Sequence, residues 1–348
     1  MSAVLAALRR PVVAAPMGGG PSTPRLVHAV GRAGGLGFLA GGYLTPARLT
    51  EDVERVRSLG AQPFGVNLFV PTIPPADDTA VRAYAARLEP EARRLGVQVG
   101  QPVFDDDAYT EKLAVLLDRP PAVVSFAFGL PSRDVVEALR ARGSEVWVTV
   151  TAPGTAPDAE VLGVDALVVQ GVEAGAHRGG VDDTDDVALL PLLRLVASRT
   201  PLPLVASGGV VDGAGLAAVL AAGAGAAQLG TAFLRCPEAG TAAVHREAVV
   251  TRTPTELTRA FTGRRARGIV NRFLREHADA PAGYPAVHHL TSPLRAAARA
   301  AHDPDAMNLW AGQTHELARE LPAGEVVARL VDEARVAVRD LTARADGW

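Results

Sequence analysis

Eight short apolar runs recur through roughly the first 230 residues, and amphipathic segments separate most of them. The runs lie at residues 12–15, 36–39, 64–69, 122–126, 145–150, 166–169, 202–206 and 226–229. A continuous apolar run of this length is typical of a parallel strand that is buried on both faces. The intervening periodicity predicts helices at residues 23–33, 46–59, 133–142, 185–199 and 213–222. Eight such units predict an α/β fold, the (β/α)8 or TIM barrel.

A doubly wound sheet is the main alternative fold, and the sequence argues against it. Such a sheet usually ends near six strands and carries a Gly-x-Gly-x-x-Gly loop after its first strand. The first glycine cluster of this chain, residues 18–20, is followed directly by Pro21 and does not fit that loop. We therefore expect a single barrel over residues 1–245.

Three further segments lie outside the repeating pattern. Residues 71–118 are too many for one strand-to-helix connection, and they predict a helical insertion in the barrel. The strand signal disappears over residues 246–323, where Pro, His and aromatic residues collect, and this predicts a helical lid or substrate subdomain over the active face. Residues 324–348 predict a C-terminal helix, extending to about residue 344, that packs on the barrel.

Composition limits the partners of this chain. Its 35 basic and 38 acidic residues give a formal net charge of −3, so no basic field is expected for nucleic acid or an anionic membrane. The apolar stretches are too short to span a bilayer, and the first charges follow an apolar run, the reverse of a signal peptide. Cys236 is the only cysteine and cannot form an internal disulfide. We expect a cytoplasmic protein, either a monomer or a homodimer.

The single lysine excludes some chemistry. Lys112 lies in the helical-looking segment 106–118, far from any Gly-rich phosphate loop, so no P-loop is present. A catalytic Schiff base would have to use this one residue.

Glycine-rich segments follow several of the predicted strands. In (β/α)8 enzymes the active site lies at the carboxyl ends of the strands, and a phosphate commonly binds between the loops after strands 7 and 8. Here those loops, residues 206–212 and 228–233, contain Ser-Gly-Gly and Leu-Gly-Thr, and Asp212 is placed to cap the following helix. Ordinary turns remain the alternative interpretation of each loop, but their joint position favours a phosphate site.

The sixth apolar run ends in Gln170 and continues into a glycine-rich segment with a single histidine, His177. A loop leaving the carboxyl end of a buried strand is where α/β folds keep their chemistry. This histidine is therefore expected to face a ligand.

Together these segments resemble the nitronate monooxygenase family, formerly called 2-nitropropane dioxygenases. The matching motifs begin at Ala14, Phe64, Val124, Gln170, Ala206 and Gln228, and further likeness lies at residues 263–268, 284–294 and 309–313. The Glu-Ala-Gly-x-His-x-Gly loop is shared with FMN-dependent enoyl-acyl-carrier-protein reductases and certain quinone reductases, whereas the motifs after residue 246 favour nitronate oxidation.

The resemblance implies non-covalently bound FMN and oxidation of alkyl nitronates by O2 to a carbonyl compound and nitrite. It assigns FMN contacts to Pro16, Met17, Asn67, Gln170, Gly175, Gly208, Gly209, Gln228, Leu229, Gly230 and Thr231. The amides of Asn67 and Gln170 suit the alternating donors and acceptors of a flavin pyrimidine ring. Alternatively, Gln170 caps a backbone amide and Asn67 forms a turn. No metal is expected.

His177 is the expected catalytic residue. It could hold the oxygens of a nitronate as a donor, or remove the α-proton of a neutral nitroalkane as a general base. The alternative is that it binds flavin phosphate or a loop carbonyl. Some members of the family carry a histidine where this chain has Ala127, which leaves the substrate open.

Two alternative functions remain. One is an FMN-dependent enoyl reductase or NAD(P)H:quinone reductase, and the other is a flavin-free phosphate-binding barrel. The absence of a Rossmann-type loop predicts poor reduction by NAD(P)H. His288 and His289 lack a partner at metal-ligand spacing and are expected to pack. Tyr284 and Trp310 could be lid packing or walls of the substrate pocket.

Overall fold

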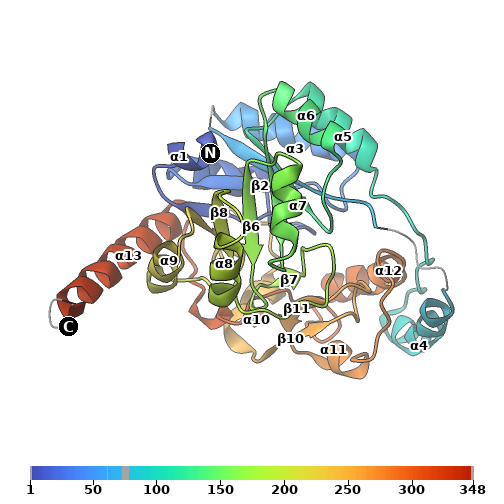
Figure 1. The fold of residues 1–348 in the computed structure, drawn as a ribbon. Coiled ribbons are helices and arrows are strands. Elements are labelled where there is room, and N and C mark those ends of the chain that lie inside the picture. Colours follow the sequence, from blue (N-terminus) through green and yellow to red (C-terminus); the bar gives the residue numbers. More distant parts are fainter. Residues whose placement is uncertain (1, 61, 73–77, 346–348) are drawn as a thin grey trace.

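The computed structural model describes residues 2–60, 62–72 and 78–345. Eight parallel strands close into a barrel in the order β1-β2-β3-β4-β5-β6-β8-β9 (Figure 1). These strands are β1 (Val12–Ala14), β2 (Leu36–Ala40), β3 (Phe64–Phe69), β4 (Val123–Ala127), β5 (Glu145–Val150), β6 (Ala166–Gln170), β8 (Leu204–Ser207) and β9 (Ala226–Leu229). The predicted (β/α)8 barrel is confirmed, since each predicted run overlaps one barrel strand.

Helices surround the barrel, and short polar side chains cap the amino ends of several of them. The five predicted helices are present as α2 (Pro24–Arg32), α3 (Pro46–Leu59), α6 (Arg133–Ala141), α8 (Leu189–Ala197) and α9 (Gly213–Ala221). The side chains that accept an N-terminal amide are those of Thr23, Thr45, Ser132 and Asp212. Two short helices, α1 (Ala3–Ala7) and α7 (Thr155–Val161), were not predicted.

Helix α8 begins four residues later than predicted. The Glu173 carboxylate accepts a hydrogen bond from the Leu189 amide, which satisfies the first turn from outside the helix. The acidic residues before it stay in the loop, where Asp185 accepts from the Thr151 hydroxyl and Asp186 pairs with Arg265. Contacts with distant residues therefore hold these acidic residues in the loop instead of in the first turn of the helix.

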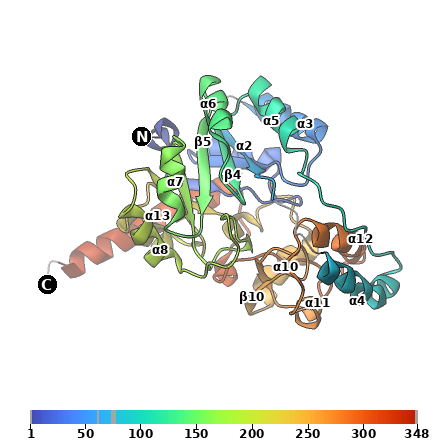
Figure 2. The same cartoon turned by 45° about the vertical axis from the view of Figure 1, so that its right-hand side comes forward.

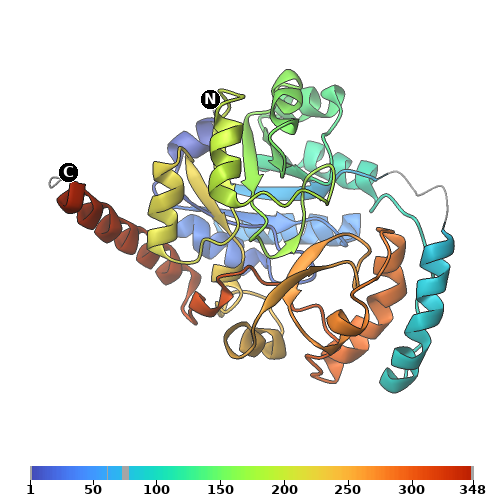
Figure 3. The ribbon, with the colours of Figure 1, turned by 60° about the horizontal axis from the view of Figure 1, so that its bottom comes forward.

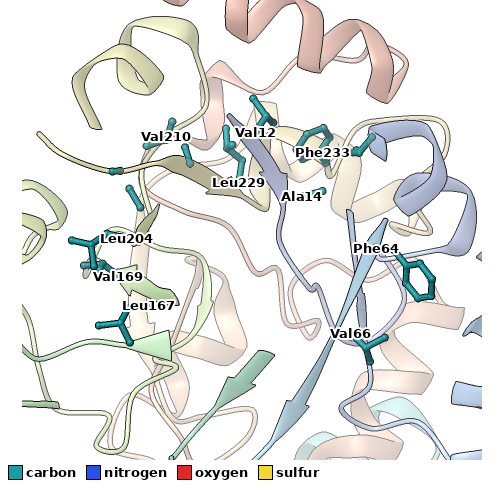
Figure 4. Close-up of a cluster of buried hydrophobic side chains, with 14 of the residues drawn as sticks. Val12, Ala14, Phe64, Val66, Leu167, Val169, Leu204, Val210, Leu229 and Phe233 are labelled. Atoms are coloured by element: carbon teal, nitrogen blue, oxygen red, sulfur yellow. The ribbon is translucent and has the colours of Figure 1, made fainter. Parts of the chain in front are cut away.

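Two apolar layers follow from the alternation of side chains along the strands. One layer lies between strands and helices and includes Val12, Ala14, Leu167 and Val169 (Figure 4). The second fills the barrel interior, where the buried rings of Phe38 and Trp147 lie 5.7 Å apart. Residues of α1 pack against this interior layer and close the amino end of the barrel.

The carboxyl end of the barrel is polar by the same alternation. Gln170, Ser207 and Gln228 each stand two residues beyond an inward-facing apolar residue, and Asn67 stands two residues beyond Gly65. All four line a cavity. The apolar filling of the barrel interior therefore ends at a polar layer. The cavity lies beyond this layer, at the carboxyl ends of the strands.

The long insertion contains two helices, α4 (Thr79–Leu95) and α5 (Tyr109–Asp118). Helix α5 stays with the barrel against α3, whereas α4 lies beside α12 (Ala286–Ala300) at the far edge of the molecule (Figure 2). A separate apolar cluster that includes Tyr84, Phe261 and Phe273 joins α4 to the later segment.

The expectation that residues 246–323 are only helical was wrong. Besides α10 (Ala243–Thr251), α11 (Arg272–Glu276) and α12, this part of the chain contains β10 (Thr255–Thr258) and β11 (Ala266–Ile269). They form an antiparallel sheet in the order β10-β11-β7, and β7 (Ala176–His177) comes from the barrel (Figure 3). The two-residue β7 pairs with β11 at distant positions, which a local apolar pattern does not reveal.

The last helix, α13 (Ala323–Ala345), packs against α9 and α2 and then extends away from the body (Figures 1 and 3). Its Glu333 carboxylate accepts a hydrogen bond from the Gly213 amide at 3.0 Å, at the amino end of α9. Within the described residues, no helix is long and apolar enough to cross a membrane.

Candidate active site

A cavity of about 280 Å³ opens at the carboxyl ends of the barrel strands. Every residue predicted for the site lines this cavity: Pro16, Met17, Asn67, Gln170, Gly175, His177, Gly208, Gly209, Gln228, Leu229, Gly230 and Thr231. The segment after β11 closes it from above, with Trp310 and Gly312 among the lining residues.

The loops after β8 and β9 form one end of the cavity. Gly208 and Gly209 have φ angles of +119° and +65°, which residues with a Cβ rarely adopt. Asp212 caps α9 by accepting from the Gly215 amide at 2.8 Å, as predicted. In the described part of the chain, the amides of Gly209 and Val210 donate to no protein acceptor. Such unpaired amides beside a helix amino end suit an anion.

Residues 312–314, within the region expected to form a lid, contact both of these loops. The Thr314 hydroxyl donates to the Gly209 carbonyl at 2.8 Å, and the Gly312 amide donates to the Thr231 hydroxyl at 3.0 Å. A Cβ on Gly175 would lie 2.6 Å from the Gly312 nitrogen. Gly175 is therefore needed for the close approach of the lid backbone.

The side-chain amides of Asn67, Gln170 and Gln228 have different hydrogen-bond partners. Asn67 donates to the Ser125 carbonyl and hydroxyl at 3.2 and 3.0 Å. Gln170 donates to the His177 carbonyl at 3.0 Å and accepts from the Gly179 amide at 2.8 Å, so its side chain holds the histidine loop. Among the described residues, the buried Oε1 atom of Gln228 has no hydrogen-bond partner.

The loop after β1 uses part of its hydrogen-bonding capacity within the protein. The Met17 amide donates to the Ser22 hydroxyl at 2.8 Å. Pro16 has no amide hydrogen, so the backbone of both residues offers carbonyl groups rather than free donors.

His177 lies on β7 with its ring among aromatic side chains. Its centroid lies 5.6 Å from that of Phe128, 6.0 Å from Tyr284 and 5.8 Å from Trp310. Tyr284 and Trp310 are therefore walls around the histidine, which the sequence left open. Phe128 itself has a φ of +73° and stacks against Phe69 at 4.3 Å.

One hydrogen bond bears on the tautomer of His177. Its Nε2 lies 2.9 Å from the Thr262 hydroxyl, and that hydroxyl donates to the Arg264 carbonyl at 3.1 Å. A hydroxyl has one proton to donate, so when that proton goes to the Arg264 carbonyl, the hydroxyl accepts from the imidazole and Nε2 carries the hydrogen. The lone pair is then on Nδ1, the nitrogen that can accept a proton.

Burial lowers the pKa of His177 to about 3, and the positive charges of Arg264 and Arg295 act in the same direction. The ring is therefore neutral at physiological pH. The donor role considered for a protonated His177 is unfavourable in this environment. A neutral ring keeps the lone pair that proton acceptance requires, while a pKa this low makes it a weak base.

His288 and His289 occupy different environments. His288 lines the cavity, and its ring stacks on Tyr43 at 4.1 Å with an interplanar angle of 3°. Burial lowers its pKa to about 2. His289 pairs with Asp105 at 2.9 Å. No cluster of three or more possible metal ligands occurs in residues 2–60, 62–72 and 78–345.

Several residues of the site were not singled out by sequence reasoning. They include Thr262, Arg264, Phe128, Tyr43 and Arg295. Ala127, at the end of β4, lines the cavity next to Phe128, so the place of the family histidine is occupied by a methyl group. Phe128 and Arg264 lie inside family motifs, Tyr43 lies in a glycine-rich segment after a predicted strand, and Thr262 and Arg295 lie directly beside motifs. Nothing in the sequence indicated their contacts.

Comparison with known proteins agrees with this geometry. The sequence model described as nitronate monooxygenase matches residues 2–333. The chain belongs to the nitronate monooxygenase family. It is 42% identical to a nitronate monooxygenase of Pseudomonas aeruginosa over 95% of this chain and 98% of the relative. It is 39% identical to one of Paraburkholderia phytofirmans over 97% of this chain and 95% of the relative.

Solved structures extend the comparison. A nitroalkane oxidase from Streptomyces ansochromogenes is similar with a TM-score of 0.95 and 50% identity, over 98% of this chain and 100% of that chain. FabK from Thermotoga maritima is 24% identical with a TM-score of 0.75, over 99% of each chain, and this likeness shows the fold alone. The members of the nitronate monooxygenase family are flavin-dependent oxidoreductases.

Proposed function

We propose that this protein oxidises alkyl nitronates with O2 to a carbonyl compound and nitrite, using FMN as its cofactor. One observation carries the proposal: a single cavity contains two loops suited to a phosphate, an unpaired buried amide oxygen and a neutral imidazole. Membership of a flavin-dependent family supports the same reaction. The enoyl and quinone reductases are the less favoured alternative, because the similarity to FabK is more distant.

The polar groups of the cavity fit FMN. The unpaired amides of Gly209 and Val210 would hold the phosphate, together with the loop of Gly230 and Thr231. The free Oε1 of Gln228 would accept a hydrogen bond that no protein group supplies. When bound, the flavin supplies the electron transfer, which side chains cannot perform.

The chain's own residues orient the substrate and move a proton. The Nδ1 lone pair of His177 would accept the α-proton of a neutral nitroalkane. A nitronate is already deprotonated and does not need this step. The rings of Phe128, Tyr284 and Trp310 around the imidazole exclude water from it.

The net change adds one oxygen atom to the nitronate carbon and breaks the carbon–nitrogen bond. Nitrite leaves with the negative charge that the nitronate carried. Each nitronate gives up two electrons and gains one oxygen atom, so one O2 balances the oxidation of two nitronates. Residues 246–323 would act as the substrate lid over this reaction, since α12 and the segment of Trp310 both line the cavity.

Anaerobic mixing tests the proposed function. The purified holoenzyme should be yellow, with absorbance near about 450 nm, and the released cofactor should be FMN by chromatography. A nitronate should bleach this absorbance rapidly, whereas NADPH or NADH should do so poorly. Rapid saturable bleaching by NAD(P)H alone would instead support the reductase alternative, and a colourless protein would support the flavin-free barrel.

A further inference from the structure

Helix α12 carries a guanidinium into the wall of the cavity. Arg295 lines the cavity, and its side chain is enclosed by protein except where it faces that space. Its hydrogen-bond acceptors are the Thr291 hydroxyl at 3.0 Å, the Ser292 hydroxyl at 2.9 Å, and the Nδ1 and carbonyl of His288 at 3.1 and 3.0 Å. All of these acceptors are neutral groups.

Other buried arginines of this region have acidic neighbours. Asp185 and Asp186 lie near Arg178, and Asp182 and Asp183 lie near Arg264. In the part of the chain that the structure describes, the groups that act electrostatically on Arg295 are two phenols and a second arginine, Arg299, without a carboxylate.

An uncompensated buried charge is costly, and it normally acquires a partner or loses its proton. Burial lowers the pKa of Arg295 to about 10, so the group stays protonated at physiological pH. The protein therefore keeps a positive charge in the cavity without supplying its counter-ion. A ligand is the remaining source of that counter-ion.

The positive charge of Arg295 lies close enough to His177 to act on its imidazole. The charge of Arg295 contributes to the lowered pKa of His177, so its field reaches the imidazole. The stacked rings of His288 and Tyr43 and the hydrogen bond from Arg295 to His288 Nδ1 hold the guanidinium in place. Nε and Nη2 donate to these protein groups, so among the described residues Nη1 is the nitrogen left to donate to an anion in the cavity.

We propose that Arg295 is the anion-binding residue of the substrate subsite and pairs with the planar NO2 group of a nitronate and of the nitrite product. This inference rests on the proposed function. Substrate and product each carry one negative charge on such a group, so the same residue serves both ends of the reaction. With a neutral nitroalkane, proton removal by His177 creates the anion beside the waiting cation.

Binding of nitrate to the holoenzyme tests this without turnover, because nitrate is a planar anion that the reaction does not consume. Nitrate should compete with a nitronate and should perturb the flavin absorbance when it binds. Arg295→Met should weaken nitrate binding and raise KM for the nitronate by about 10- to 100-fold, the usual effect of losing hydrogen bonds to a charged group. The KM of the neutral nitroalkane should change only a few-fold.

Two further variants separate charge from scaffold. Arg295→Lys keeps the charge but not the planar guanidinium that these acceptors hold in place, and it should bind nitrate between wild type and Arg295→Met. Arg275→Met removes an exposed positive charge from α11, outside the cavity, and should leave nitrate binding unchanged.

Unchanged nitrate affinity in Arg295→Met, or absence of nitrate competition in the wild type, would overturn the inference. If Arg295→Met loses its flavin, the wild-type competition and the Lys variant still decide the matter. A protein that binds nitrate through Arg295 but does not oxidise nitronates would refute the proposed function and leave this subsite standing.

Discussion

His177 and Arg295 divide two tasks that one protonated histidine could otherwise perform. Burial and neighbouring cations keep the imidazole neutral, so it can accept a proton, while the positive charge is placed on the guanidinium. Gln170 holds the histidine loop through the His177 carbonyl rather than through its ring. The imidazole can therefore be removed without removing this anchor.

His177→Ala should keep the yellow FMN complex and reduce turnover by about 10²-fold or more, the usual contribution of a positioned acid or base. His177→Gln retains a donor but cannot take a proton near neutral pH, so it should impair nitroalkane oxidation more than nitronate oxidation. Oxygen consumption with both substrates, and flavin absorbance, measure these effects. Loss of flavin from the alanine variant would assign His177 to cofactor binding, and equal losses in the glutamine variant would remove its role as base.

Thr262 is a positioning residue for that base. Thr262→Val preserves the shape of the side chain but removes the acceptor of the His177 Nε2 hydrogen, so the Nδ1 lone pair is no longer fixed. Turnover of a nitroalkane should fall about 10-fold, by the value of one hydrogen bond, with a smaller effect on the nitronate. Thr262→Ser should restore activity. Equal losses on both substrates without rescue by serine would indicate a structural role only.

At the scale of elements, the barrel strands could be predicted because each is a continuous apolar run buried on both faces. The strands β7, β10 and β11 could not, since they are short and partly polar and pair across distant parts of the chain. His177 lies on one of these strands. The sequence therefore predicted that this histidine faces a ligand but not which groups surround it.

The loop between β8 and α9 gives a prediction about the cofactor. Gly209→Ala would place a Cβ 3.2 Å from that of Glu173 on a backbone with φ of +65°, at a cost of about 1 to 2 kcal/mol. Relaxation of this strain should move the unpaired amides and weaken FMN binding, and Gly209→Val should release FMN. Fluorescence of free FMN during dialysis measures the change.

A matched control is available on the opposite side of the barrel. Gly143 has a φ of +86°, and a Cβ there would meet nothing within 4 Å. Gly143→Ala should lose similar stability and keep its flavin. Full FMN occupancy in Gly209→Val would refute the assignment of this loop to the phosphate.

For the whole molecule, the sequence predicted residues that line the cavity but not the charged residue that sets its electrostatics. The positions of Asn67, Gln170, Gln228 and the glycine loops follow from strand ends, which a barrel brings to one face. Arg295 reaches the same cavity from the lid, where no repeating pattern gives its distance from His177. Its missing counter-ion is visible only in three dimensions.

The lid and barrel together bury several histidines in neutral form, and this makes stability depend on pH. The pKa is lowered by burial to about 3 in His177, about 4 in His245 and about 2 in His288, and it is also lowered in His277. The unfolded chain binds these protons near pH 6.5, whereas the folded protein does not. Their contribution is complete above pH 6.5 and is lost as pH falls toward the folded pKa values.

His177, His245 and His288 should therefore each cost the folded state about 1.4 kcal/mol between pH 7.5 and 5.5, or on the order of 4 kcal/mol together. Asp107 and Asp165, whose pKa values are raised by burial, oppose part of this loss. Urea unfolding of the holoenzyme at pH 7.5, 6.5 and 5.5 measures this loss of unfolding free energy. His277→Phe should reduce the pH-dependent loss, because one histidine with a lowered pKa is removed from the aromatic cluster of Tyr84 and Phe273. A midpoint that does not change over this range would show that the folded protein admits these protons, and His177 would then be protonated near neutral pH.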